Sequence, residues 1–182
     1  MQDIFPERNR EVFNNEYGRH FFDVLTDNGT IIEFQHSPIG LEDFAFRTDA
    51  YTEYALVHSA PRPIWIFDYA GRNFFVESRG KFSPRNRKLK WYRPSQIFGE
   101  YRSKTAKYEL WFRVNPLKYK PEFSVVNGVI RGATYGAVTS GVGYLKVKGI
   151  YGDNLSLVYG DAYAESEFIS YLKSFQQEEI ND

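Results

Sequence analysis

Apolar and polar residues alternate early in the chain with the period of β-strands, and one stretch changes to the period of a helix. Residues 10–13, 20–26 and 30–35 are strand-like, and the apolar run at 64–69 is typical of a buried strand. Residues 41–55 repeat apolar positions at helical spacing. The order strand, strand, strand, helix, strand predicts an α/β (α+β) fold, with a mixed sheet that starts with a β-hairpin and continues as a βαβ-like unit.

The second half of the chain predicts a β-rich extension that ends in a helix. Residues 79–96 are polar, basic and contain two prolines, which favours a loop or extended arm, while 108–114 are strand-like. Residues 124–152 are punctuated by glycine and predict short strands and turns. Residues 165–179 have the pattern of an amphipathic helix. We therefore expect a core over residues 1–72, with residues 73–182 packed on it.

Composition narrows the class of protein. Of the 182 residues, 42% are hydrophobic and 18% aromatic, which is enough for a packed core. The absence of cysteine excludes disulfides and thiolate metal sites. No apolar run is long enough to span a membrane, and the first residues lack the apolar stretch of a signal peptide. We expect a cytoplasmic protein with no membrane partner.

The turn at residues 27–29 decides how two acidic residues are placed. A two-residue Asn-Gly turn would set Asp23 opposite Phe34. A three-residue loop, with Gly29 in the left-handed conformation, would set Asp23 opposite Glu33. The second register separates polar from apolar residues, so we favour it. It sends four apolar side chains to the other face, toward the core: Phe22, Val24, Ile32 and Phe34.

In the favoured register Gln35 shares the face of Asp23 and Glu33. Like charges directly opposite each other destabilise a sheet by about 0.2–1 kcal/mol. A divalent cation would remove that repulsion, because both carboxylates are hard oxygen ligands. The alternative is that the two acids only face solvent.

Four stretches together resemble a known family. They are HFFDV at 20–24, IIEFQHSPI at 31–39, FRTDAY at 46–51 and IWIFD at 64–68. They resemble the nuclease domain of the competence protein CoiA-like family, which is similar to the PD-(D/E)xK, restriction-endonuclease-like nucleases. The resemblance implies a restriction-endonuclease-like core and an endo- or exonuclease that acts on DNA, with Mg²⁺ as cofactor and Mn²⁺ as a substitute.

The resemblance also implies roles for single residues. Asp23 matches the first metal-binding acid, Glu33 matches the acid of the E-x-K element, and the main-chain carbonyl of Phe34 matches a further metal ligand. Gln35 stands where lysine is usual. Three more residues match positions of the family's catalytic motifs: His20, His36 and Arg47.

The residue pattern leaves the direction of these last three side chains open. Arg47 either reaches the site from its helix or pairs with an acid on the helix surface, such as Glu42. Strand alternation turns His20 to the face opposite Asp23, unless the strand ends or bulges there. His36 is likewise turned away from its neighbour Gln35.

Charge is unevenly distributed although the formal net charge is zero. Eleven basic residues lie between Arg72 and Lys107, opposed by Glu77 and Glu100. Local positive charge attracts a polyanion, and exposed aromatic rings stack on unpaired bases. The alternative is a solvated loop anchored by its aromatic residues. The residues that we expect to bind nucleic acid are Arg79, Lys81, Arg85, Arg87, Lys88, Lys90, Trp91 and Arg93.

These observations predict a metal-dependent nuclease that hydrolyses phosphodiester bonds, with DNA as its nucleic-acid partner. Gln35 in place of lysine favours a second hypothesis, a degenerate nucleic-acid-binding module of the same fold. A third is a protein-interaction module that uses the glycine-rich β region.

Overall fold

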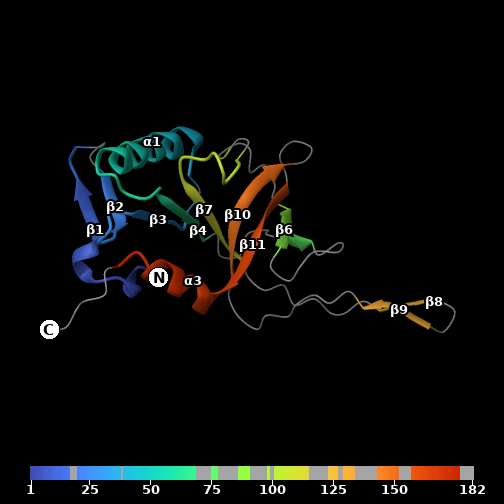
Figure 1. The fold of residues 1–182 in the computed structure, drawn as a ribbon. Helices are drawn as coiled ribbons and strands as arrows, with labels where there is room; N and C mark the ends of the chain where they lie inside the picture. Colours follow the sequence, from blue (N-terminus) through green and yellow to red (C-terminus); the bar gives the residue numbers. More distant parts are fainter. Residues whose placement is uncertain are drawn as a thin grey trace.

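The computed structural model describes most of the chain as one large sheet with a helix on each face (Figure 1). The described residues are 1–16, 20–37, 39–68, 75–77, 86–90, 98, 101–114, 123–126, 129–133, 143–151 and 157–176. The strands are β1 Arg10–Asn14, β2 His20–Leu25, β3 Ile31–Gln35, β4 Ile64–Phe67, β5 Phe75–Glu77, β6 Asn86–Lys90, β7 Glu109–Val114, β8 Phe123–Val126, β9 Val129–Ala133, β10 Gly143–Tyr151 and β11 Leu157–Ala164. The helices are α1 Leu41–Val57 and α3 Glu165–Lys173, with 3-10 turns η1 Gln2–Ile4 and η2 Glu7–Asn9 before β1.

The sheet has nine strands in the order β1-β2-β3-β4-β7-β10-β11-β6-β5. β4 is parallel to both β3 and β7, and every other neighbouring pair is antiparallel. Parallel neighbours need a crossover, and α1 supplies it between β3 and β4. The predicted mixed α+β fold, with a hairpin followed by a βαβ unit, is confirmed. Strands from both sides of residue 72 share this sheet; the division into 1–72 and 73–182 stays a prediction.

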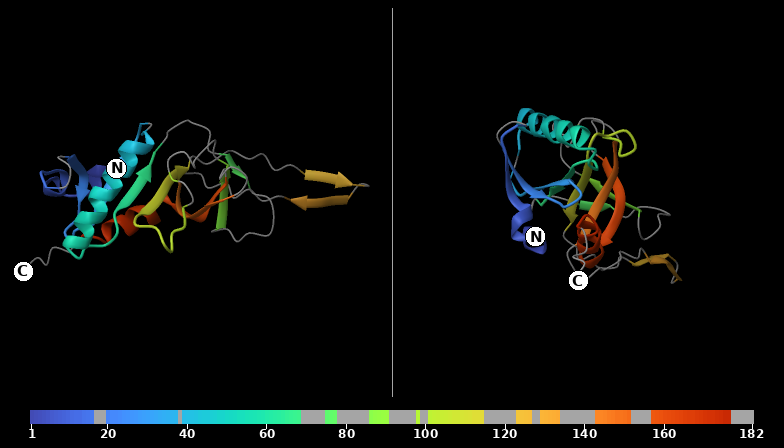
Figure 2. Two further views of the ribbon diagram at one scale, coloured as in Figure 1. Left: turned by 90° about the horizontal axis from the view of Figure 1, so that it is seen from above. Right: turned by 60° about the vertical axis from the view of Figure 1, so that its left-hand side comes forward.

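Among the described residues, α1 lies on one face of the sheet and α3 on the other, as the right-hand view of Figure 2 shows. On one face α1 packs its Phe44 and Tyr51 against Trp65 of β4. On the other face α3 packs Phe168 against Trp111 of β7, together with the N-terminal turns. β4 lies between its two parallel neighbours and is buried on both faces, which explains why its sequence is an unbroken apolar run.

A buried polar network fixes α3 to the sheet. The Glu109 carboxylate accepts hydrogen bonds from the indole of Trp111 and the hydroxyl of Tyr171, both at 2.6 Å. The Lys146 ammonium lies 2.7 Å from the second Glu109 oxygen. Glu109 is buried, so its charge is stable there only because all three groups donate to it.

Most predicted elements are confirmed, with ends that differ by a few residues. The loop or extended arm predicted for residues 79–96 is wrong for 86–90, which form β6 and pair with β11 inside the sheet. The region 124–152 contains the short hairpin β8–β9, a separate two-stranded sheet, but also the nine-residue strand β10. Among the described residues, no helix has the length and apolarity needed to cross a bilayer.

Candidate active site

The β2–β3 hairpin adopts the three-residue loop that the sequence favoured. The backbone N–H of Thr26 donates to the carbonyl of Thr30 at 3.0 Å, and Gly29 has a φ of 82°. The left-handed position therefore falls on the residue that adopts it without strain. The same register, continued along the strands, sets Asp23 opposite Glu33.

Main-chain pairing between β2 and β3 stops just before the two acids. The last paired residues are Val24 and Ile32. Beyond them the Asp23 carboxylate takes the place of a main-chain acceptor, because its Oδ2 accepts a 2.7 Å hydrogen bond from the N–H of Phe34. The Asp23 side chain thus lies between the two strands.

The Phe34 carbonyl faces the same gap. Successive residues of a strand direct their N–H and C=O groups to alternate edges. The Gln35 carbonyl accepts from the N–H of Asp68, on the β4 side. The N–H and C=O of Phe34 therefore point toward β2 and Asp23.

Glu33 is only 3% exposed and lies beneath α1. Its Oε1 accepts from Arg47 Nη1 at 2.9 Å, and its Oε2 accepts from the Tyr51 hydroxyl at 2.8 Å. Arg47 and Tyr51 are four residues apart, so one helix face presents both. The hypothesis that both acids only face solvent is wrong for Glu33, because α1 covers it. Arg47 reaches the site instead of pairing on the helix surface.

His20 also lies beside Glu33. Its Nε2 is 3.8 Å from Glu33 Oε1, and its ring stacks on Tyr51 with 6.1 Å between centroids. Strand alternation predicted the opposite face for His20, and that prediction is wrong. Phe22 also departs from the predicted face. Its ring packs against Tyr51 of α1, with 5.4 Å between the ring centroids. Both residues lie beyond the end of β2–β3 pairing, where β2 stays paired with β1, and the change of face falls between Phe22 and Val24.

Burial and like charge act together on Asp23. Burial, and then the Glu33 charge, raise the pKa of the Asp23 carboxyl from 3.8 to about 6. The Phe34 N–H, His20 and Arg47 lower this pKa, but they do not offset the two larger effects. The two carboxylates are therefore electrostatic neighbours with too little positive charge around them.

The other two motif residues lie at the far end of β3. Gln35 is buried, and its amide donates to the carbonyl of Ser37 at 2.5 Å. His36 is exposed, and its Nδ1 lies 3.6 Å from Oδ2 of Asp68. Asp68 also accepts a hydrogen bond from Arg113 of β7. His36 thus joins a second polar group, while Asp23, Glu33, His20 and Arg47 gather under α1.

The sequence model for the family described as competence protein CoiA, nuclease-like domain, matches residues 11–118, more than half of the chain. The chain belongs to this family. The predicted resemblance is thereby confirmed, and all six motif residues lie within the CoiA nuclease-like segment. No curated protein and no solved structure matches the chain.

The donor atoms of this CoiA nuclease-like domain fit a hard divalent cation. Asp23 and Glu33 supply carboxylates and Phe34 supplies a carbonyl, which are the oxygen ligands that Mg²⁺ accepts. The raised pKa of Asp23 indicates a place where added positive charge is stabilising. Arg47 and Tyr51 already donate to the two Glu33 oxygens, so a cation would share one of these oxygens with Arg47 or with Tyr51.

Side-chain ligands alone do not complete such a site. Within the described part of the chain, no group of three or more His, Cys, Asp or Glu side chains is arranged to hold a metal ion. The carbonyl of Phe34 and solvent are therefore needed beside the two carboxylates.

The predicted nucleic-acid-binding residues are only partly placed. Arg87, Lys88 and Lys90 belong to β6, an inner strand of the sheet. The others lie outside the described residues: Arg79, Lys81, Arg85, Trp91 and Arg93. Their role in binding stays a prediction.

Sequence reasoning missed Tyr51 and Asp68 as members of these polar groups. Tyr51 is four residues after Arg47, and that helical spacing was an available signal. Asp68 follows a buried strand that is parallel to β3, so its nearness to His36 depends on the order of strands, which local patterns do not contain.

Proposed function

We propose that this chain is a metal-dependent nuclease that hydrolyses phosphodiester bonds, with DNA as substrate and Mg²⁺ as cofactor. One observation carries the proposal. Inside a nuclease-like domain, Asp23 and Glu33 are both largely removed from solvent, and burial and then the Glu33 charge raise the pKa of Asp23.

The residues under α1 divide the work of such a site. Asp23, Glu33 and the Phe34 carbonyl hold the cation, which when bound polarises the scissile phosphate and acidifies water. Tyr51 fixes the direction of the Glu33 carboxylate through its hydroxyl. Arg47 brings a permanent positive charge to the place where negative charge develops on the phosphate.

His20 and Gln35 have more limited roles. The Nε2 atom of His20 is buried and has no hydrogen-bond partner among the described residues, so it is available to hold a proton or a phosphate oxygen. Gln35 does not exchange a proton, so it contributes hydrogen bonds to the phosphate or to the attacking water.

A degenerate binding module is the second candidate, and one observation favours it. Both oxygens of Glu33 are already engaged, by Arg47 and by Tyr51, and Gln35 replaces the usual lysine. Such a module binds nucleic acid without cleaving it.

A cleavage assay separates the two candidates. Labelled single- and double-stranded DNA and RNA are incubated with Mg²⁺, with Mn²⁺ or with EDTA. We expect metal-dependent cleavage that falls by at least about 100-fold in Asp23→Asn and in Glu33→Gln. The exposed acids of α1 provide matched controls, Asp49→Asn and Glu53→Gln, which should cleave normally. Salt-sensitive binding without cleavage would refute the nuclease and support the degenerate binding module.

A further inference from the structure

One face of the sheet emerges from beneath α3 and carries an exposed aromatic ring. Along β11, Tyr163 and Tyr159 share this face because they are four residues apart on a strand. The Tyr163 ring packs on Trp111, 5.2 Å between centroids, under the cover of α3. Tyr159 lies beyond that cover and is 38% exposed. The sheet thus presents a large ring to solvent on this face of β11, beyond the cover of α3.

The Tyr159 ring lies against the backbone of β10. Gly149 is its direct partner in the β10–β11 register. A Cβ atom at Gly149 would come within 2.6 Å of Tyr159 Cε1, so only glycine leaves room for the ring there. The neighbouring strand holds the ring from one side, which makes the ring a fixed platform.

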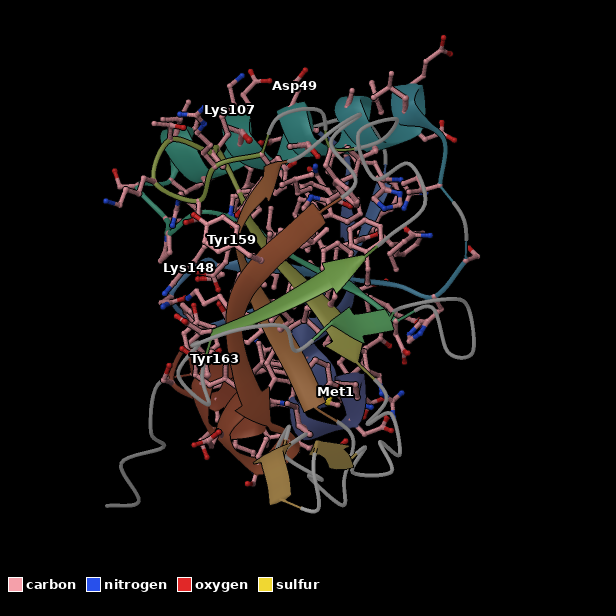
Figure 3. The ribbon with its side chains drawn as sticks, turned by 90° about the vertical axis from the view of Figure 1, so that its right-hand side faces the viewer. Met1, Asp49, Lys107, Lys148, Tyr159 and Tyr163 are labelled. Carbon is pink, nitrogen blue, oxygen red and sulfur yellow. The ribbon has the colours of Figure 1, made fainter. Side chains whose placement is uncertain are left out.

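A β-bulge brings a lysine beside this platform. The pairing of β10 with β11 shifts between Val147 and Gly149, which leaves Lys148 as the extra residue. Its Nζ lies 2.7 Å from Oδ1 of Asp161, two residues from Tyr159 on the same face of β11. Figure 3 shows Lys148 and Tyr159 near each other on the sheet, with Asp49 on α1 and Lys107 beside that helix.

Two further basic residues belong to the same cross-strand row. Exposed Arg102 forms an isolated bridge with Gly149, and the N–H of the next residue, Ser103, donates to the carbonyl of Lys148 at 3.0 Å. On the other side, Lys88 of β6 occupies the position opposite Tyr159. By main-chain pairing, the row runs Arg102, Gly149, Tyr159, Lys88.

We propose that this row, with Lys148, is a binding site for single-stranded nucleic acid. An unpaired base stacks on Tyr159, and Lys148 and Arg102 contact the phosphates on either side of it. A duplex does not fit this chemistry, because the faces of its bases are already stacked on each other. The proposal rests on the proposed function only for the choice of nucleic acid as the partner. It adds that the nucleic acid is single-stranded, and that it binds at a place away from the carboxylates of Asp23 and Glu33.

The test measures binding in EDTA, so that cleavage plays no part. Two fluorescent oligonucleotides of about 15 nucleotides, one of thymidines and one abasic throughout, are titrated with the full chain. One stacked base corresponds to an affinity ratio between the two strands of roughly fivefold or more. Tyr159→Phe should keep this ratio. Tyr159→Ala should reduce it to about one without weakening the abasic strand, and Gly149→Ala should reduce it by displacing the ring.

The lysine is tested by the salt dependence of binding. Lys148→Gln should weaken both strands equally and reduce the slope of log affinity against log salt by about 0.7, the value for one phosphate contact on a single strand. Lys107→Gln is the matched control, because Lys107 is also exposed and paired with an acid, Asp49, but lies beside α1. Lys107→Gln should leave the slope unchanged.

Three results would overturn the proposal: equal affinity of the unmodified protein for both strands, a ratio that survives Tyr159→Ala, or equal slopes for Lys148→Gln and Lys107→Gln. The first needs no variant, so it decides the matter even if Tyr159→Ala fails to fold. A protein that shows the thymidine preference but never cleaves with any metal would support this site and refute the proposed nuclease.

Discussion

Replacing Asp23 by asparagine should stabilise the metal-free protein at neutral pH. Burial and the Glu33 charge raise the pKa of Asp23 from 3.8 to about 6. The rise corresponds to about 3 kcal/mol, at about 1.4 kcal/mol for each pH unit, less a discount for screening at the solvent-facing edge. Asparagine keeps an oxygen that can accept from the Phe34 N–H, and it removes the charge.

The sign of the effect follows from linkage. Because its pKa is raised, the folded state binds a proton at Asp23 more tightly than the unfolded state does. The stability that this provides is complete below about pH 4 and is lost as the pH rises through about 6. Asp23→Asn does not lose stability in this way as the pH rises. Its free energy of unfolding, relative to that of the unmodified protein, should therefore increase from nearly equal at about pH 4 to as much as about 3 kcal/mol higher at about pH 7.5.

Urea unfolding at a series of pH values measures the difference directly. Added Mg²⁺ should stabilise the unmodified protein at neutral pH, because ligands that bind only the folded state add to its stability. Mg²⁺ should have little effect on Asp23→Asn. An asparagine variant that is less stable than the unmodified protein at neutral pH, or a difference that does not depend on pH, would refute the reasoning.

Three further predictions concern stability. Arg47→Gln should lower the free energy of unfolding of the metal-free protein by about 3 kcal/mol, because it leaves the buried Glu33 without the Arg47 guanidinium. An unchanged free energy of unfolding in urea would contradict the ion pair. Tyr171→Phe should lower it by about 1.5 kcal/mol by removing one donor from Glu109, without changing any cleavage activity; unchanged denaturation would show that this bond is not needed. Gly29→Ala should lower it by about 1–2 kcal/mol, because φ is 82° there; calorimetry that finds no loss would argue against the three-residue loop.

The hairpin and its register could be predicted because their causes are local. The Asp-Asn-Gly turn has one residue suited to a left-handed position, and the favoured register alone separates polar from apolar residues. The helix, expected over residues 41–55 and observed over 41–57, was predictable for the same reason, since its spacing and its acidic first turn lie within the segment. Neither conclusion needed knowledge of distant residues.

The direction of side chains beyond Asp23 could not be predicted from alternation. The change of face falls at Asp23, whose carboxylate replaces a main-chain acceptor where β2–β3 pairing stops, although β2 stays paired with β1 as far as His20. His20 therefore reaches Glu33 instead of the opposite face. The burial of Glu33 depends in turn on the position of α1 over the sheet, a contact between segments that no single stretch of sequence encodes.

The strand β6 was missed for a related reason. Its residues, NRKLK at 86–90, are polar and basic, and they join the sheet because β11 supplies the partner from about seventy residues further along the chain. Propensity alone favoured a loop. Long-range pairing decided the outcome, as it also did for the placement of Asp68 beside His36.

Calorimetric titration with Mn²⁺ tests the central claim most directly, that Asp23 and Glu33 hold one divalent cation together. We expect one binding site in the unmodified protein, and its loss in both Asp23→Asn and Glu33→Gln, with the site intact in Asp49→Asn. Mn²⁺ that binds equally well to all four proteins, or to none, would contradict the claim.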